Sequence, residues 1–577
     1  MIIRNLTRLV IVLFACLIPA LLTAQQSQSG PATAASTPKQ QAPASAAQPP
    51  AQQASPATQP PGAPVQNQNP QAQSPNPSST PAAPNPGYTL RVMSRLVVLD
   101  MVVVDKKGKV VKDLNRNDFK VEEEGEPQTV LNFEQTGMHT PDPQLSIEST
   151  ADLDRLAPRA PVDIILLDEF NTRFEDMAFA RYSLKKFLDK QPDKLPAPTM
   201  LIAVDLQHFT VLRDYTQNKD ELINALDHHF VSYPWQMHQG AWVGERYATA
   251  FITLRRVAQA VIGHPGHKNM IWIGRGFPPM RFDRMEIDAT NRINNAVQDC
   301  VNVLRDARVT LYTIDPAGLQ VNPGAYGGDP MVDPFGGNYE FNRLAKATGG
   351  RTLYGRNDVD MEIGTAIQDG SSFYTLTYRP SNTSPDPRKF RHIKVTLSRP
   401  DLSVITRAGY YLEHGPGRVD PVNPSRRLIT DLVAADSSTM VYDGVRINVE
   451  ASPADPEQFI IHVDGHNLAW TPATDTEPRH AEVILVVSTY DKKDKELSRV
   501  ANVVRSNAPR TAPPTGRMLL DMNIPHKIAY NPKAVRARFT VRVDASGRIG
   551  TADVQLGPHA ASPAPQPAPT PAAQSAR

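Results

Sequence analysis

Between residues 162 and 370, short apolar runs alternate with segments that repeat apolar side chains at helical spacing. The run VDIILLD (Val162–Asp168) is typical, because the segment after it places Met177, Leu184 and Leu188 on one helical face. Apolar runs of this kind predict strands that are buried on both faces, as in a parallel sheet covered by helices. The alternation therefore predicts an α/β fold with a doubly wound, Rossmann-like, mainly parallel sheet.

Three further segments are rich in β-branched residues. We expect a small β-sandwich over residues 88–136 and a second β-sandwich over residues 425–557. Residues 137–161 are predicted to be a polar linker, and residues 371–412 a β extension of the α/β domain. The predicted organisation is an α/β sheet flanked by N-terminal and C-terminal β-sandwich-like domains.

The two ends of the chain have a different composition. Residues 1–24 carry Arg4 and Arg8 before an apolar run and small residues, which predicts a secretory signal peptide. A retained anchor and a lipoprotein signal at Cys16 are the alternatives, but the run is shorter than the roughly 18–20 residues of a membrane span. Residues 25–87 and 558–577 are rich in Pro and Ala and are predicted to be a disordered spacer and tail.

Charge and cysteine content limit the possible partners and cross-links. The chain has 61 Lys and Arg against 59 Asp and Glu, for a net charge of +2. Because nucleic-acid binding requires a clustered basic face, we expect no nucleic-acid partner. Removal of the signal peptide leaves Cys300 as the single cysteine, and its spacing from Val297 and Leu304 predicts a core position on a helix.

Several stretches resemble the von Willebrand factor type A fold and, more narrowly, the VWFA-related domain group of secreted acidobacterial proteins. They lie within residues 90–411 and read VVVDKKGKVVKDLNRNDFKVEEEGEPQTVLNFE, VDIILLDEFNT, NMIWIGRGFPP, ATGGRTLYG, FYTLTYRP and IKVTLSRPDLSVITRAGYY. The first and last are the most specific. The resemblance implies a Rossmann-like α/β domain that binds other proteins and has no known catalytic activity. It does not extend to residues 425–577.

The resemblance also implies where a metal ion would bind. Type A domains that hold a metal use Asp-x-Ser-x-Ser after the first strand, a Thr from a later loop and an Asp after the fourth strand. The matching positions here are Asp168, Phe170 and Thr172, and then Arg275 in place of the last Asp. Phe170 has no oxygen, although Asn171 beside it offers an amide oxygen. Because Mg²⁺ prefers near-octahedral oxygen ligands, we expect no bound metal, with Asp168 as the one weak candidate ligand.

Two interpretations of Asp168 stay open. The carboxylate could cap the turn or helix that follows its strand. Alternatively, the first and fourth strands of a type A fold are neighbours, so Asp168 and Arg275 would meet where the strand order reverses. We expect an ion pair there, in which the guanidinium fills the space of the ion in metal-binding relatives.

Two loops contain residues that could bind a metal. The HPGH sequence (264–267) has two histidines but no neighbouring Cys or carboxylate cluster, so we expect surface histidines in a loop. The Gly-rich segment 322–338 lacks the Lys and Ser or Thr of a phosphate-binding loop and is expected to be a lid. It contains Asp329 and Asp333, for which weak Ca²⁺ binding is the alternative.

Trp235 and Trp242 lie in YPWQMHQGAWVGERY, on a connection expected above the top of the sheet. If they are exposed, they would be anchors for a partner. The alternative is that they pack the long loop onto the domain.

These observations favour a secreted or periplasmic binding protein whose α/β domain contacts another protein through its sheet-top loops. Paired carboxylates and an activated nucleophile were not found near the predicted strand ends, which counts against the alternative of a cell-envelope or extracellular hydrolase. A purely structural envelope spacer is the third hypothesis. The binding candidates are Asp168, Asn171, Thr172, Arg275, Trp235 and Trp242.

Overall fold

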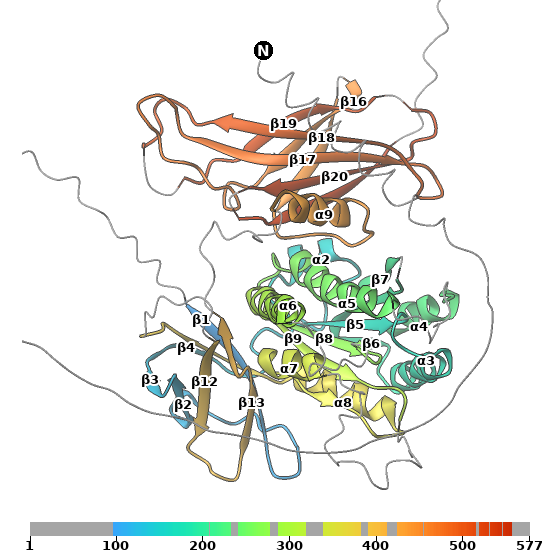
Figure 1. Ribbon diagram of the computed structural model, residues 1–577, viewed down its shortest axis with the longest axis vertical. Helices are drawn as coiled ribbons and strands as arrows, with labels where there is room; N and C mark the ends of the chain where they lie inside the picture. The colour runs from blue at the N-terminus through green and yellow to red at the C-terminus, as the bar shows by residue number, and fades with distance from the viewer. Residues whose placement is uncertain are drawn as a thin grey trace, which may run out of the picture. The chain divides into compact units, whose positions relative to one another are not determined.

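The described part of the chain is mixed α/β and contains five β-sheets (Figure 1). The computed structural model describes residues 96–206, 208–231, 241–276, 287–318, 339–381, 390–411, 424–453, 455–514, 518–529, 531–544 and 546–556. The predicted signal peptide, spacer and tail lie outside these residues. No helix within them is long and apolar enough to cross a membrane.

The largest sheet has six strands in the order β10-β9-β8-β5-β6-β7, of which all but β7 run parallel. The strands span Val162–Asp168 (β5), Lys194–Val204 (β6), Phe209–Asn218 (β7), Lys268–Ile273 (β8), Val309–Ile314 (β9) and Thr352–Leu353 (β10). The chain crosses over between β5 and β8, which are the first and fourth strands of the sheet. This confirms that the ends of these two strands are neighbours.

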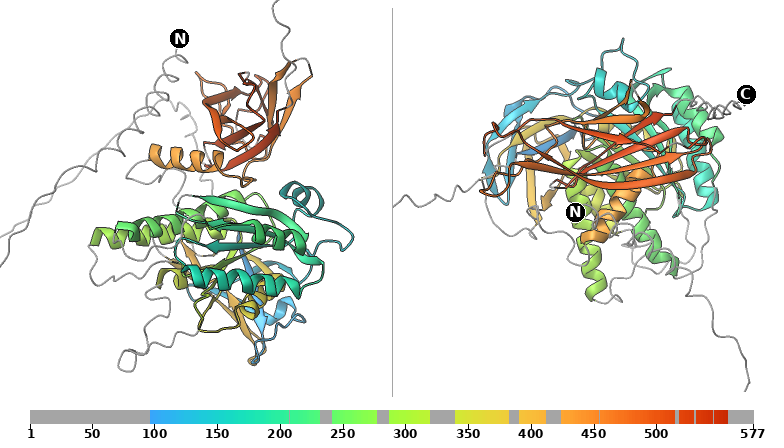
Figure 2. Two further views of the ribbon diagram at one scale, coloured as in Figure 1. Left: turned by 90° about the vertical axis from the view of Figure 1, so that its right-hand side faces the viewer. Right: turned by 90° about the horizontal axis from the view of Figure 1, so that it is seen from above.

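Helices cover both faces of this sheet (Figures 1 and 2). One face packs against Thr150–Leu156 (α2), Ala241–Ala260 (α5), Ile287–Asp306 (α6) and Tyr339–Thr348 (α7). The other packs against Phe174–Asp189 (α3), Lys219–His228 (α4) and Val359–Ser371 (α8). Every residue of β5 is buried, as its unbroken apolar run predicts. Cys300 is buried in the first of these cores, which confirms its predicted position.

Strands from residues 88–136 and 371–412 form two sheets together, which differs from the predicted separation of these segments. The sheet orders are β13-β1-β11-β4 and β14-β12-β2-β3. The strands span Val97–Val104 (β1), Phe119–Glu123 (β2), Glu126–Gln128 (β3), Val130–Glu134 (β4), Tyr374–Tyr378 (β11), Phe390–Leu397 (β12), Ser403–Thr406 (β13) and Gly409–Tyr411 (β14). Leu114 and Phe119 lie in the core that the two sheets share. The α/β segment is therefore inserted between two halves of one β unit.

The C-terminal region contains two sheets, of order β15-β16-β19 and β18-β17-β20-β21, which share one core. Its elements span Pro424–Asp436 (α9), Ile447–Ser452 (β15), Asp455–Val463 (β16), His480–Tyr490 (β17), Glu496–Asn507 (β18), Met522–Lys527 (β19), Arg536–Val543 (β20) and Ile549–Gln555 (β21). Two helices were not predicted from the sequence: α9, and α2 within the expected linker. Ser149 caps α2 by accepting a hydrogen bond from the backbone N–H of Asp152.

The HPGH turn lies at the amino edge of the sheet, where the parallel strands begin, and its histidines are buried rather than on the surface. His264 donates from Nε2 to the carbonyl of Ala160 at 2.7 Å. Gly263 donates to the Asp443 carboxylate at 2.7 Å, and Asp443 donates its own N–H to Ala260. The expectation of surface histidines is wrong because this turn is covered by contacts with residues far away in the sequence.

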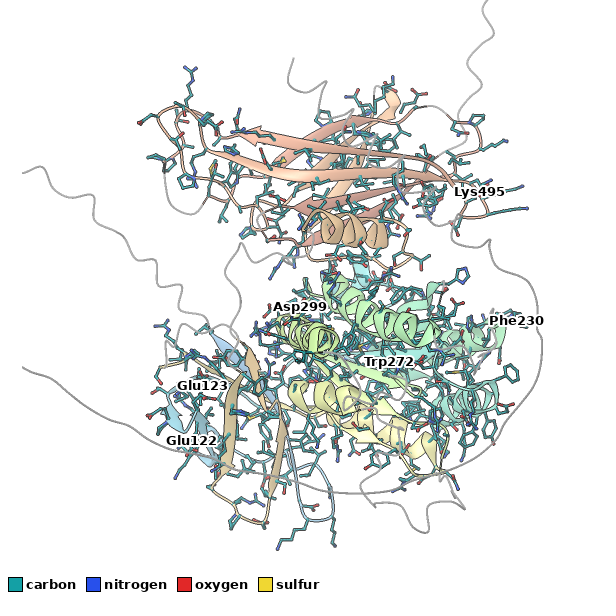
Figure 3. All side chains as sticks on the ribbon, viewed as in Figure 1. Glu122, Glu123, Phe230, Trp272, Asp299 and Lys495 are labelled. Carbon is teal, nitrogen blue, oxygen red and sulfur yellow. The ribbon has the colours of Figure 1, made fainter. Side chains whose placement is uncertain are left out.

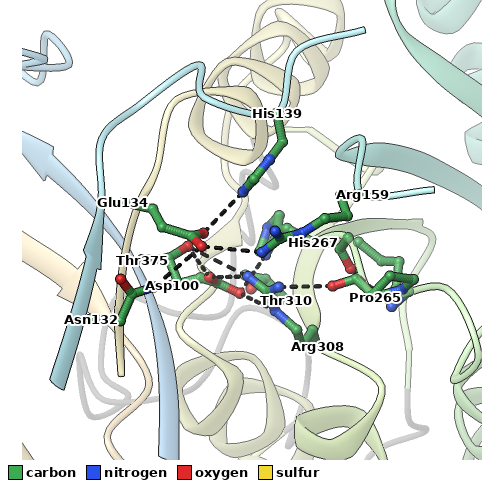
Figure 4. A network of polar contacts seen from close by, with 12 residues as sticks. Asp100, Asn132, Glu134, His139, Arg159, Pro265, His267, Arg308, Thr310 and Thr375 are labelled. Carbon is green, nitrogen blue, oxygen red and sulfur yellow. Dashed lines mark hydrogen bonds and ion pairs between the residues drawn. The ribbon is translucent and has the colours of Figure 1, made fainter. Parts of the chain in front are cut away.

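A buried ionic network joins the same edge to the N-terminal β unit (Figure 4). Asp100 of β1 accepts from Arg308 at 2.7 Å, from His267 at 3.0 Å and from Thr375 at 2.7 Å. Burial alone would raise the pKa of Asp100, but Arg308 and His267 keep it well below its usual range. The amino edge of the six-stranded sheet is thus occupied by contacts with the N-terminal β unit, through Asp100, and with the C-terminal region, through Asp443.

Candidate functional site

The carboxyl edge of the six-stranded sheet, where β5, β8 and β9 end, brings together four of the predicted site residues. Asp168 is the last residue of β5, and Asn171 and Thr172 follow it. Arg275 follows β8, which lies beside β5. Asp315, which was not predicted, follows β9. In a doubly wound sheet, this is the edge at which ligands bind.

Asp168 is fully buried, and both its carboxylate oxygens are engaged by the protein. Oδ1 accepts from the N–H of Asn171 at 2.9 Å, and Oδ2 accepts from the Trp272 indole and the Gly276 N–H, both at 3.0 Å. Burial raises the pKa of Asp168 to about 7, even though these donors favour the charged form. The contact with Asn171 fits the interpretation of Asp168 as a turn cap.

The residues around Asp168 close over it. Phe170, which replaces a metal ligand of the type A pattern, is buried with its ring edge-on to Trp272 at 6.2 Å. Gly274 has φ +151°, and a Cβ there would lie 2.4 Å from the Cβ of Asp168. Thr172 accepts from the N–H of Arg275 at 3.2 Å. These contacts fix the loops after β5 and β8 against each other.

The expected ion pair between Asp168 and Arg275 is not formed among the described residues. The guanidinium of Arg275 lies instead beside Asp315, with 3.7 Å between Nε and Oδ1. Asp168 interacts electrostatically with Arg246 of α5, a buried residue, and burial lowers the pKa of Arg246 although the charge of Asp168 opposes this shift. The prediction was wrong because Asp168 turns inward to backbone and indole donors, whereas Arg275 extends toward the next strand.

This donor set does not fit a dication. Asp168 has no oxygen free of N–H donors, Phe170 contributes none, and Arg275 brings a positive charge. Within the described residues, no group of three or more His, Cys, Asp and Glu side chains is placed to hold a metal ion. Asp329 and Asp333, the alternative Ca²⁺ ligands, lie outside the described residues.

Some acceptors near this edge remain without a donor in the part of the chain that the structure describes. Glu362, in the first turn of α8, is buried with neither carboxylate oxygen hydrogen-bonded, and Oδ1 of Asn171 also has no partner. Burial raises the pKa of Glu362 to about 7, and the nearby charge of Asp358 adds to this.

Glu169, by contrast, is paired. Its carboxylate lies 2.7 Å from Nε2 of His229, and this contact fixes the end of α4 beside β5.

Large apolar side chains are exposed along the same edge. Phe174 begins α3, Ile287 begins α6 and Met361 lies in the first turn of α8, so each belongs to a helix that starts there. Tyr354 follows β10, and Phe230 follows His229 at the end of α4. Their exposed fractions run from 45% for Tyr354 to 81% for Phe230, which points away from α4 in Figure 3. Sequence reasoning missed this set, although each residue lies at or near the end of a helix or strand.

The two tryptophans proposed as anchors cannot be placed in this set. Trp235 lies outside the described residues. Trp242 belongs to α5 rather than to a loop, and its side chain is not described.

Comparisons with known proteins identify no family. No protein-family model matches the chain, and no curated protein matches it. Among solved structures, the chain is similar to the pilus adhesin SpaC from Lactobacillus rhamnosus GG, with 8% identity over 77% of this chain and a TM-score of 0.26. It spans 58% of that adhesin.

A Bacteroides uniformis β-glucuronidase matches 32% of this chain and 19% of its own length, with 13% identity and a TM-score of 0.11. These scores are too low to carry an argument about fold or function.

Proposed function

We propose that this chain is a secreted or periplasmic protein-binding module that contacts a partner through the carboxyl edge of its α/β sheet. We also propose that the fold is the one expected from the sequence, a sheet of the von Willebrand factor type A kind that is flanked by β-sandwich-like domains. The observation that carries the proposal is the set of exposed apolar residues at this edge: Phe174, Phe230, Ile287, Tyr354 and Met361. Groups of exposed apolar residues commonly mark sites of interaction with other proteins, and aromatic residues are frequent among the anchors of such interfaces.

The attachment of the flanking β regions supports the choice of edge. Asp100 and Asp443, from the two β regions, both contact the amino edge of β8. A partner at the carboxyl edge would meet no competition from these contacts.

We propose that binding requires no metal ion and that the chain is not an enzyme. Asp168 acts as a structural carboxylate, since its oxygens are used to order the loops after β5 and β8. A hydrolase would need an acid and a base that reach a substrate. Assay of the purified chain against envelope polysaccharides and peptides tests this directly, and turnover that depends on Asp168 or Glu362 would overturn it.

The binding surface can be tested by replacing two of its aromatic residues. The double variant Phe174→Ser and Phe230→Ser should weaken capture of the partner from an envelope extract roughly tenfold or more, as expected for hot-spot residues. Its unfolding midpoint should stay unchanged because both side chains are exposed. Tyr182→Ser is the matched control, since Tyr182 is equally exposed on α3 but lies two turns from the edge. Equal losses in the two variants would contradict the proposal.

A further inference from the structure

Two hairpin turns in different β regions share four of five residues and have a similar hydrogen-bonded geometry. Residues 105–109 read DKKGK and follow β1, and residues 491–495 read DKKDK and join β17 to β18. We call these two turns the lysine tips. In each, the backbone N–H of the first Asp donates to the carbonyl of the last Lys, at 2.9 Å from Asp105 and 3.0 Å from Asp491.

The first Asp of each tip directs its carboxylate inward. Oδ1 of Asp105 accepts from the N–H groups of Lys107 and Lys109 at 2.8 and 2.9 Å. Oδ1 of Asp491 accepts from the corresponding residues, Lys493 and Lys495, at 2.8 and 3.0 Å. Each carboxylate therefore orders the backbone of its own turn, which is the usual role of Asp at this position.

The fourth position adopts a left-handed backbone in both tips, with φ +78° at Gly108 and +56° at Asp494. The side chain of Asp494 is paired with Arg536 at 3.1 Å. Arg536 begins the strand β20 and is also paired with Asp553 at 2.6 Å, so two carboxylates share its charge.

The remaining three positions of each tip carry lysines that the turn does not require. All six are exposed: Lys106, Lys107, Lys109, Lys492, Lys493 and Lys495. Among the described residues none of the six forms an ion pair, whereas Lys185, Lys219 and Lys527 do. Lys495 lies at the end of its hairpin in Figure 3. The tips thus present exposed ammonium groups outside any ion pair of the described residues, and their charges act on the first Asp of each tip, where they help to lower the pKa of Asp105 and Asp491.

We propose that the lysine tips bind the surface of an anionic phospholipid bilayer. Exposed lysines attract phosphate-bearing headgroups additively, and a convex hairpin tip fits a flat surface better than it encloses a polymer. The tips contain no apolar side chain, so the contact is electrostatic and without insertion. It must weaken as salt shortens the Debye length from about 10 Å at 0.1 M to about 3 Å at 1 M. This binding is separate from the proposed protein contact at the carboxyl edge.

Co-sedimentation of the full chain with vesicles tests the proposal. The chain should sediment with vesicles that contain phosphatidylglycerol at low salt, more than with phosphatidylcholine alone. Replacing the three lysines of either tip by Gln should weaken binding roughly tenfold or more, and replacing all six should reduce it to the phosphatidylcholine level. Circular dichroism and unfolding should remain unchanged because the side chains are exposed.

A matched control distinguishes the effect of the lysine tips on vesicle binding from the effect of the net charge of the whole chain. Lys394, Lys527 and Lys533 are exposed lysines elsewhere in the β regions, and their triple Gln variant removes the same charge as one tip. This control should bind within about twofold of the unaltered chain. The proposal is overturned if the control loses as much as a tip variant, or if the six-lysine variant still binds. Inorganic polyphosphate or DNA that binds the tips more tightly than the vesicles would also overturn it.

Discussion

At the scale of single residues, the chain keeps several carboxylates where burial opposes their charge. Asp163, Asp168 and Glu362 all lie within the α/β region, and burial raises the pKa of each to about 7. The sequence pointed to Asp168 because it ends an apolar strand. It could not reveal where the carboxylate turns, since that depends on Trp272 and Gly276, which are far away in the chain. The side-chain partner of Arg275 was mispredicted for the same reason.

Asp163 gives a prediction with a defined pH window. Its Oδ1 accepts from Nδ2 of Asn269 at 2.9 Å, while Oδ1 of Asn269 has no partner. Because the folded state raises the pKa of Asp163 from 3.8 to about 7, its stabilising effect is complete below about pH 3.8. It is lost as the pH rises through about 7. Asp163→Asn stays neutral and can donate to Asn269, so above pH 7 it should be more stable by about 1–3 kcal/mol.

Urea unfolding over a pH series measures this difference. The free energy of unfolding of the variant should fall less steeply between about pH 4 and pH 7 than that of the unaltered chain. An equal slope, or a variant that is less stable above pH 7, would show that Asp163 is stabilised as a carboxylate.

At the scale of elements, the strands of the α/β region were predictable and some short helices were not. The apolar runs of β5, β8 and β9 are only six or seven residues long and contain β-branched or aromatic side chains, which favours buried strands over helices. The helix α2 is only 7 residues long, and it is stabilised by contacts such as Thr150 with Asp214 at 2.7 Å. Such contacts across the chain leave no periodic signal in a short segment.

Two glycines should respond in opposite ways to the same substitution. A Cβ on Gly263, in the amino-edge turn, would lie 1.8 Å from the carbonyl oxygen of Asp443. Gly263→Ala should therefore destabilise the protein by about 3 kcal/mol. In α8, a Cβ on Gly364 would meet only the Phe187 ring at 3.4 Å, an ordinary contact. Gly364→Ala should stabilise the protein by up to about 1 kcal/mol because alanine favours the helix.

Thermal and urea unfolding of the two variants check this pair. If Gly263→Ala is tolerated, the turn is not packed against residue 443, and the anchoring role of the amino edge fails. If Gly364→Ala destabilises, the packing of α8 on α3 is tighter than its contacts indicate.

At the scale of the whole molecule, the decisive feature is that one β unit is built from two distant segments. The pairing of β1 with β11 and β13 brings residues 97–104 against residues 374–378 and 403–406. Both segments read as β in the sequence, but the choice of partner strands depends on register and shared core, which a single sequence does not display. The set of exposed residues at the carboxyl edge could not be predicted for the same reason, because its members become neighbours only when the sheet is assembled.

The network at Asp100 should couple this β unit to the α/β region. Arg308→Met would leave a buried carboxylate without its main cation and should cost about 3–5 kcal/mol. Arg159→Met removes the exposed partner of Glu134 and should cost less than about 1 kcal/mol. Because Arg308 helps keep the pKa of Asp100 well below 3.8, this stabilisation is present above that pH and is lost as the pH falls through the depressed value.

Urea unfolding at neutral and acidic pH measures the coupling. The difference between the unaltered chain and Arg308→Met should shrink as the solution is acidified. A difference that is constant with pH would mean that Arg308 acts by packing alone.

Site-specific photo-cross-linking tests the central claim, that the carboxyl edge is the partner-binding surface, most directly. Benzoylphenylalanine can replace Phe174 or Phe230 at this edge, and Met138 or Val503 as exposed positions elsewhere. After irradiation in an envelope extract, the account predicts the same cross-linked protein from positions 174 and 230 and none from 138 and 503. Cross-linking to one protein from position 138 or 503, with none from 174 and 230, would contradict it.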